Sequence, residues 1–217
     1  MMGIELVENF RFPYFVRTPQ EFWRHWHISL STWLRDYLYI PLGGSRGSEW
    51  QTRRNLLLTM VLGGLWHGAA WTFILWGAYH GLLLVAHRAA ERAGALRALR
   101  MLPQPILRVV AWAIMFHVTC YGWLIFRART LDQIGDMTRA LIFDFAPGSV
   151  NVAGLLVPLA MYTTPLLLIH ACEAWFDDVL VVPKLPIAVR YSVYAAAVYL
   201  TVLFGNFGGA EFIYFQF

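Results

Sequence analysis

The sequence has 217 residues, of which 59% are hydrophobic and only 14% charged, whereas a typical soluble domain carries about 25% charged residues. Aromatic residues make up 16% of the chain, and amphipathic aromatic rings favour the membrane–water boundary. The composition therefore excludes an ordinary soluble domain and indicates a protein embedded in a lipid bilayer.

The formal net charge of +4 comes almost wholly from arginine, because Lys184 is the single lysine. No basic run stands clear of the apolar segments, so nucleic acid is not an expected partner. Arginines that flank membrane spans and face anionic lipid account for the charge. Cys120 and Cys172 each lie inside an apolar run, which is typical of small buried side chains and not of a disulfide framework.

The chain begins with MMGIELVENFRFPYF, which lacks the basic start and apolar core of a cleavable signal sequence. For an integral membrane protein, such a beginning indicates an internal point of a longer protein.

An amphipathic helix is predicted at residues 22–39, where apolar and polar residues fall on opposite halves of a helical wheel. Thr18 is the predicted N-cap, Pro19 the first helical residue and Glu21 the capping-box partner. Pro41 and the glycine pair that follows it are expected to end the helix.

Further along, four stretches lack Asp, Glu, Lys and Arg: 55–87, 109–126, 145–172 and 191–210. A helix needs about 20 apolar residues to cross a hydrocarbon core of about 30 Å, so each of the last three predicts one span. We expect the third to be entered after Pro147 and Gly148 and to be kinked at Pro158 and Pro165. Polar connectors are expected at 87–100, 127–141 (as a short surface helix) and 177–186 (as a loop).

The first charge-free stretch, residues 55–87, is too long for one straight span, because its 33 residues would extend for about 50 Å. It must tilt strongly, break or turn back, and LGGLWHGAAW at 62–71 predicts a break. Non-helical backbone at membrane depth is tolerated where protein or water covers it, so we expect a lined cavity at Gly63 to Gly68. The predicted fold is all-α: a polytopic helical membrane protein with a re-entrant or broken helix and an amphipathic interfacial helix.

Two histidines are candidates for chemistry. His27 falls within the apolar half of the predicted amphipathic helix, whereas His25 falls on the polar half. A lone histidine on an apolar face is more often structural than catalytic, although burial would lower the pKa of His27 and keep its ring neutral. His67 is the stronger candidate, because ionisable residues at membrane depth are costly and mark function. The alternative is a helix-packing site, in which glycines permit close contact and the histidine bonds across the interface.

The remaining histidines have weaker signals. His80 is beside a glycine, which favours helix packing. Interhelical hydrogen bonds are the simplest role for His117 and His170, and His87 is expected at the membrane interface.

Three motifs resemble the membrane-bound O-acyltransferase family: FWRHWHISLSTWLRDYLYIPLGG at 22–44, GGLWHGAAWTFILWGAYHG at 63–81 and the final EFIYFQF. The resemblance runs from about residue 9 to residue 217 and favours the bacterial branch that acetylates exported, alginate-like polysaccharides. It implies one multi-pass transmembrane domain over residues 1–217 in the bacterial inner membrane. It also implies that His67 is the family's catalytic histidine and that His27 occupies the second histidine motif, while His25 stands where arginine is usual.

The resemblance implies transfer of an acetyl group from a thioester to a sugar hydroxyl. His67 would act as the general base, and His27 would orient the acceptor or polarise the thioester carbonyl. Neither direct transfer nor an acyl-enzyme is excluded, but no Ser or Cys adjoins His67, which favours direct transfer. Acetyl-CoA is the expected donor, with no bound cofactor, and periplasmic acetylation proteins are expected partners.

The weaker substrate-binding candidates are the residues beside these histidines and the arginines around the first break. Those arginines would hold the donor's phosphates, although arginines that flank a span more often anchor it to lipid. The candidates are Trp66, Arg24, Arg35, Arg46, Arg53 and Arg54. A metal site is not predicted, since His25 and His27 point to different helix faces and no acidic cluster accompanies them. LGGSRGS lacks the Lys-Ser/Thr pair of a phosphate-binding loop.

The family's members carry several more spans before NFRFPYF, so we expect this chain to be the C-terminal portion of a longer protein and inactive alone. Two other interpretations stay open. One is a related acyltransferase whose acceptor is a teichoic acid or a protein, and the other is a non-catalytic membrane scaffold or transport subunit.

Overall fold

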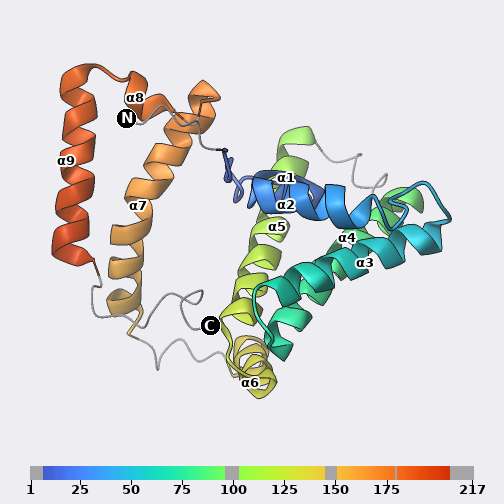
Figure 1. The fold of residues 1–217 in the computed structure, drawn as a ribbon. Coiled ribbons are helices and arrows are strands. Elements are labelled where there is room, and N and C mark those ends of the chain that lie inside the picture. The colour runs from blue at the N-terminus through green and yellow to red at the C-terminus, as the bar shows by residue number, and fades with distance from the viewer. Residues whose placement is uncertain (1–6, 96–102, 145–150, 179, 206–217) are drawn as a thin grey trace. The chain divides into compact units, whose positions relative to one another are not determined.

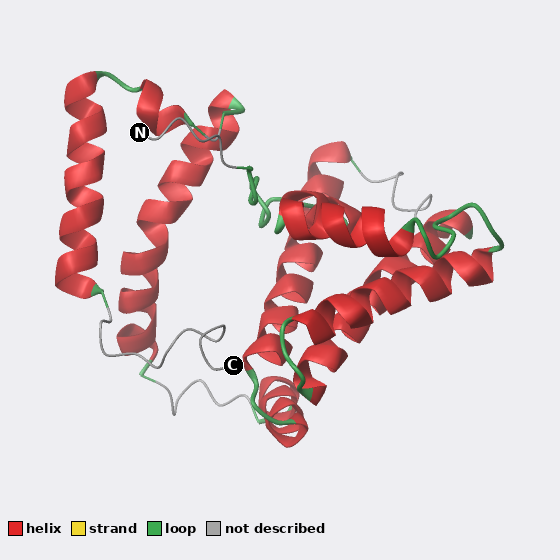
Figure 2. Cartoon of the chain, viewed as in Figure 1, coloured by secondary structure: helices red, strands yellow, loops and turns green. Residues whose placement is uncertain are grey.

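The structure, a computed structural model, describes residues 7–95, 103–144, 151–178 and 180–205 (Figures 1 and 2). Within these ranges the regular structure is helical, apart from one isolated antiparallel bridge between Phe10 and Trp26. The chain divides into two compact units, residues 1–145 and 146–217, and each is described by itself.

The first unit begins with two short helices, α1 (Pro19–His25) and α2 (Ile28–Leu34), which a π-helical turn, η1 (Arg35–Tyr39), extends. The predicted start is confirmed, because the Thr18 hydroxyl accepts a hydrogen bond from the Glu21 N–H at 3.1 Å. In the predicted capping box the Glu21 carboxylate would accept from the N–H of Thr18. It accepts instead from the N–H of Arg17, one residue earlier, at 2.8 Å.

The continuous helix predicted through residues 22–39 is wrong, because the chain breaks at Trp26 and His27. Residues 9–11 pair with the break: the Arg11 N–H donates to the His25 carbonyl, and the Ile28 N–H to the Asn9 carbonyl, both at 3.0 Å. The Asn9 side-chain oxygen also accepts from the N–H of Ser29 at 3.1 Å. Asn9, which is 19 and 20 residues before the two N–H groups it accepts from, therefore caps α2, and no helical wheel can reveal this contact.

Helices α3 (Glu49–Trp66) and α4 (Trp71–Arg92) form a hairpin and lie side by side in Figure 1. Of the three possibilities for the long charge-free stretch, the chain turns back, and it does so inside the predicted break. A capping box of Ser48 and Gln51 starts α3. Because α4 runs to Arg92, the polar connector expected from residue 87 begins as helix.

Helix α5 (Gln104–Arg127) packs on both α1 and α4, and α6 (Leu131–Ile142) follows it. Phe22 of α1 is fully buried in a cluster with Met115 of α5. Trp76 of α4 is buried with Ile125 of α5 and Ile134 of α6. The predicted surface helix is confirmed as α6, and these clusters fix α1, α4 and α5 around the turn of the hairpin.

The second unit consists of α7 (Val152–Phe176), the single turn α8 (Val181–Lys184) and α9 (Ile187–Phe204). The Tyr162 hydroxyl of α7 donates to the Phe204 carbonyl of α9 at 2.7 Å. The two predicted spans of this half are confirmed where the structure describes them. The entry at Pro147 and Gly148, and the final motif at 211–217, lie outside the described residues.

Among the described residues, three helices are long and apolar enough to cross a membrane: α5, α7 over Val152–Glu173, and α9. In α7 and α9 none of the residues in the apolar window is buried within the described structure, so their apolar side chains are available to lipid. The prediction of an all-helical membrane fold is confirmed.

Candidate functional site

The turn of the α3–α4 hairpin places His67 at the end of α3. Its N–H donates to the Gly64 carbonyl at 3.0 Å, and the Gly68 N–H donates to the Leu65 carbonyl at 3.1 Å. Gly68 then adopts a φ of 153°, a conformation that favours glycine, before α4 begins. The Gly in the WHG motif therefore lets the chain reverse directly after the histidine.

The His67 ring is enclosed by aromatic rings and is only 7% exposed. Trp76 of α4 and Phe126 of α5 each lie 5.1 Å from it between ring centroids, nearly perpendicular to its plane. Trp66 lies at 5.0 Å and Phe73 at 6.2 Å. Such apolar surroundings favour the neutral imidazole, which is the form that can accept a proton.

The second histidine, His27, occupies the break between α1 and α2 with a left-handed φ of 43°. Its ring centroid lies 6.3 Å from that of Trp66 in an edge-to-face arrangement. Burial lowers the pKa of His27. Its Nδ1 is buried and has no side-chain or backbone hydrogen-bond partner recorded among the described residues.

Trp66 joins the two histidines, because its ring contacts both, and 54% of its surface is exposed. The structure thus brings together three of the predicted site residues: His27, Trp66 and His67. Their roles in chemistry stay predictions.

The predicted donor-binding arginines do not gather at this site. Arg35 is paired with Asp36 at 2.7 Å in η1, and Arg24 is exposed on α1. Arg53 lies 14 residues before His67 on α3, which places it about 21 Å away along the helix. Arg46 is exposed in the loop before α3, and Arg54 donates to the Asn55 side chain at 3.0 Å.

Arg53 belongs instead to a cluster that joins the open ends of the hairpin. Glu49 at the start of α3 pairs with Arg53 at 3.6 Å, with Arg88 at 3.1 Å and with Arg92 at 2.6 Å, the last two on α4. Burial raises the pKa of Glu49, but the hydrogen bond from Arg88 and the arginine charges lower it overall. We call these four residues the Glu49 cluster.

Sequence reasoning missed Asn55, which fixes the loop before α3. Its side chain is 1% exposed, and its amide donates to the carbonyls of Leu42 at 3.0 Å and Gly44 at 3.1 Å. An asparagine in an apolar run was the only available signal. His80 was predicted to pack between helices, and its ring does so, stacked on Phe22 at 5.7 Å and perpendicular to Trp23.

The cavity predicted at Gly63 to Gly68 is wrong for its first two residues, which are buried in helix contacts. A Cβ on Gly63 would lie 3.0 Å from Leu34 Cδ1, and one on Gly64 would lie 2.2 Å from the Phe73 carbonyl oxygen. Gly64 thus permits close packing of α3 on α4, and Gly63 permits packing against α2, in line with the packing alternative that the sequence left open.

These features belong to a known class of membrane protein: residues 2–126 match the model of the membrane-bound O-acyltransferase family, and the chain belongs to that family. Among relatives, the chain is 50% identical over 151 residues to the probable alginate O-acetylase AlgI of Azotobacter vinelandii, covering 70% of this chain and 28% of that protein. The identity is 52% over 145 residues to the probable alginate O-acetylase AlgI of Pseudomonas aeruginosa PAO1, covering 67% and 26%.

A third relative is the peptidoglycan O-acetyltransferase of Helicobacter pylori 26695, with 42% identity over 140 residues, or 64% of this chain and 26% of that protein. The chain therefore spans between a quarter and a third of the length of these relatives. The residues matched to the family include α1 to α5 and hence both histidines.

Proposed function

We propose that this chain is the histidine-bearing part of a membrane O-acetyltransferase that acts on hydroxyls of an exported, alginate-like polysaccharide. The observation that carries the proposal is the meeting of His67, Trp66 and His27 at the turn of a hairpin, in a chain that belongs to an O-acyltransferase family. The similarity to the two alginate O-acetylases supports the polysaccharide acceptor.

His67 is the general base of the proposed reaction. As a sugar hydroxyl oxygen attacks the thioester carbonyl, its proton passes to the neutral imidazole, and a C–O bond forms. The tetrahedral intermediate then collapses, the C–S bond breaks, and the imidazolium returns the proton to the departing thiolate. Proton transfer by a positioned histidine contributes roughly a hundred- to ten-thousand-fold in rate.

In this proposal His27 and Trp66 bind and orient the reactants. In this proposal the imidazole of His27, whose Nδ1 has no recorded partner among the described residues, hydrogen-bonds either the acceptor or the thioester oxygen. Trp66 offers a broad exposed ring next to both histidines, on which an apolar sugar face can rest. Reactants approach His67 past this ring.

The proposed donor is acetyl-CoA, which arrives from the cytoplasmic side, while the acceptor is outside. The proposal places the protein in the bacterial inner membrane as a multi-pass protein that works with periplasmic acetylation partners.

The test is His67→Ala at the gene of the producing organism, which keeps whatever else the chain works with. We expect O-acetyl groups on the exported glycan, measured by mass spectrometry, to fall by about a hundredfold or more, while membrane insertion is unchanged. His117→Ala on the exposed face of α5 is the matched control and should leave acetylation intact.

The outcomes separate the interpretations. Loss of acetyl groups from peptidoglycan, a teichoic acid or a protein, with the polysaccharide unchanged, would move the proposal to that acceptor. Unchanged acylation of every surface polymer, with the variant inserted normally, would exclude an acyltransferase that uses His67.

A further inference from the structure

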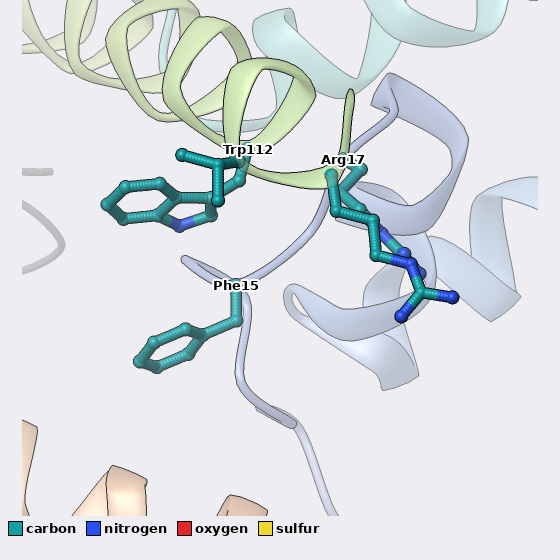
Figure 3. A pocket seen from close by; sticks show the side chains of 5 residues that line it. Phe15, Arg17 and Trp112 are labelled. Carbon is teal, nitrogen blue, oxygen red and sulfur yellow. The ribbon is translucent and has the colours of Figure 1, made fainter. Parts of the chain in front are cut away.

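An open surface cavity of about 390 Å³ lies between the segment before α1 and the first turns of α5. Figure 3 shows the rings of Phe15 and Trp112 on one side of it and the side chain of Arg17 on the other. Arg108 and Val109 of α5 complete the lining. The cavity therefore has an aromatic, apolar part and a cationic part.

The charge of Arg108 is uncompensated, and that of Arg17 is only loosely paired. Within the part of the chain that the structure describes, Arg108 makes no ion pair or hydrogen bond, and Arg17 reaches a carboxylate only at 3.9 Å, to Glu21. Guanidinium groups bind phosphate oxygens through paired N–H donors. The cationic part is thus suited to an anion that carries such oxygens.

The aromatic part is held in place. The Trp112 Nε1–H donates to the Tyr14 carbonyl at 2.8 Å, which ties its indole to the segment that carries Phe15 and Arg17. Phe15 is 44% exposed and Trp112 37% exposed, so both rings present apolar surface to whatever occupies the cavity.

The position along α5 places the cavity at the membrane boundary. The helix has 24 residues and extends for about 36 Å, against a hydrocarbon core of about 30 Å. Arg108 lies four residues, or about 6 Å, from its first residue, where an arginine side chain reaches the headgroups. Trp112 lies one turn deeper on the same face, where it meets the upper part of an acyl chain.

We propose that this cavity binds an anionic phospholipid, with the headgroup phosphate between Arg17 and Arg108 and an acyl chain against Phe15, Val109 and Trp112. A zwitterionic lipid is disfavoured, because its ammonium group would approach two arginines. A soluble phosphate ester satisfies the same arginines but leaves the aromatic rings uncovered, which is why the lipid is the chosen occupant.

The experiment measures lipid binding to the purified chain in detergent by native mass spectrometry. The probes are dioleoyl phosphatidylglycerol and dioleoyl phosphatidylcholine, and glycerol 3-phosphate is the soluble competitor. We expect phosphatidylglycerol to bind preferentially and Arg17→Gln/Arg108→Gln to weaken its binding about 25-fold, from roughly fivefold for each charge. Arg129→Gln, which removes an exposed arginine beyond the other end of α5, is the control and should change nothing.

Equal binding of the two lipids, equal loss in the control, or full displacement by millimolar glycerol 3-phosphate would each overturn the proposal. If the double variant does not fold, a photoreactive phosphatidylglycerol analogue is applied to the unmodified chain instead. Crosslinks at residues 15–17 and 108–112 support the site, and crosslinks confined to other segments overturn it.

Discussion

At the scale of single residues, the two histidines differ in how far sequence could place them. His67 was predicted at a break because a 33-residue charge-free stretch is too long for one span and glycines interrupt it. His27 was placed on a continuous helical wheel, whereas it occupies a left-handed conformation at a junction. The pairing of Asn9 with that junction depends on contacts distant in sequence, so no local pattern predicts it.

The conformation of His27 allows its structural and chemical roles to be separated. A left-handed conformation costs a residue other than glycine roughly 1–2 kcal/mol, and asparagine tolerates it. We expect His27→Gly and His27→Asn to keep the free energy of unfolding within about 1 kcal/mol of the unmodified chain, because glycine's gain in the folded state offsets its greater unfolded-state entropy. Chemical denaturation in detergent measures it.

Both variants should nevertheless lose about a hundredfold or more in glycan acetylation, as expected when a group that bonds the reacting oxygen is removed. Normal acetylation in His27→Asn would show that the imidazole has only a packing role.

At the scale of elements, the sequence predicted where the α3–α4 hairpin breaks but not how its two helices pack. The break and the glycines were evident in the sequence. Whether those glycines line a cavity or allow close helix packing depends on which backbone they face, and the sequence does not show that. A Cβ on Gly77 would lie 2.3 Å from the Met60 carbonyl oxygen, so α3 and α4 touch through their main chains there. Main-chain atoms cannot move aside as a flexible side chain can.

Gly77→Ala should therefore separate the helices and destabilise the chain by about 1–3 kcal/mol or more. The matched control is Gly135→Ala in α6, where a Cβ would meet nothing within 4 Å. That change should stabilise the chain by about 0.5–1 kcal/mol, because alanine loses less backbone entropy in a helix. Thermal unfolding compares the two, and equal effects would contradict close contact at Gly77.

The Glu49 cluster predicts how the hairpin responds to acid. Because the arginines hold the pKa of Glu49 below its ordinary 4.5, the cluster stabilises the fold above that pH. The contribution is lost as the pH falls from 4.5 through the lower folded-state value.

Glu49→Gln should accordingly lower the melting temperature at pH 7, and the difference from the unmodified chain should shrink as the pH falls below 4.5. Added salt should shrink it at pH 7 as well, since the side chains are partly exposed. A difference that stays constant from pH 7 to pH 3 would mean that the carboxylate charge plays no part.

At the scale of the whole molecule, the spans were the most predictable feature, because absence of charge over about 20 residues has one main explanation. Helices α5, α7 and α9 follow that rule. The hairpin helices α3 and α4 are not among the three, and charged residues at their open ends pair with one another. The pairing of Arg53 with Glu49 beside Arg88 and Arg92 depends on the turn of the hairpin, so the sequence alone could not predict it.

The crossing by α7 can be tested by labelling its two ends. With Cys120 and Cys172 replaced by serine, single cysteines are introduced as Asn151→Cys and Asp178→Cys, just outside the helix. A membrane-impermeant maleimide applied to intact cells and to inverted vesicles should reach the two positions from opposite sides. Labelling of both from one side would show that α7 does not cross.

The pairing of residues 9–11 with the break between α1 and α2 matters when relatives of this chain are compared. Asn9 is not among the proposed reacting groups, yet its carbonyl and side chain accept hydrogen bonds from the start of α2, directly after His27, whose ring lies beside Trp66. Without the hydrogen bonds from residues 9–11, α1 and α2 could join into one continuous helix. The imidazole of His27 would then no longer lie beside Trp66. A relative that keeps both histidines but lacks this asparagine should therefore not be assumed active, since inheritance of the reactive groups does not guarantee inheritance of their alignment.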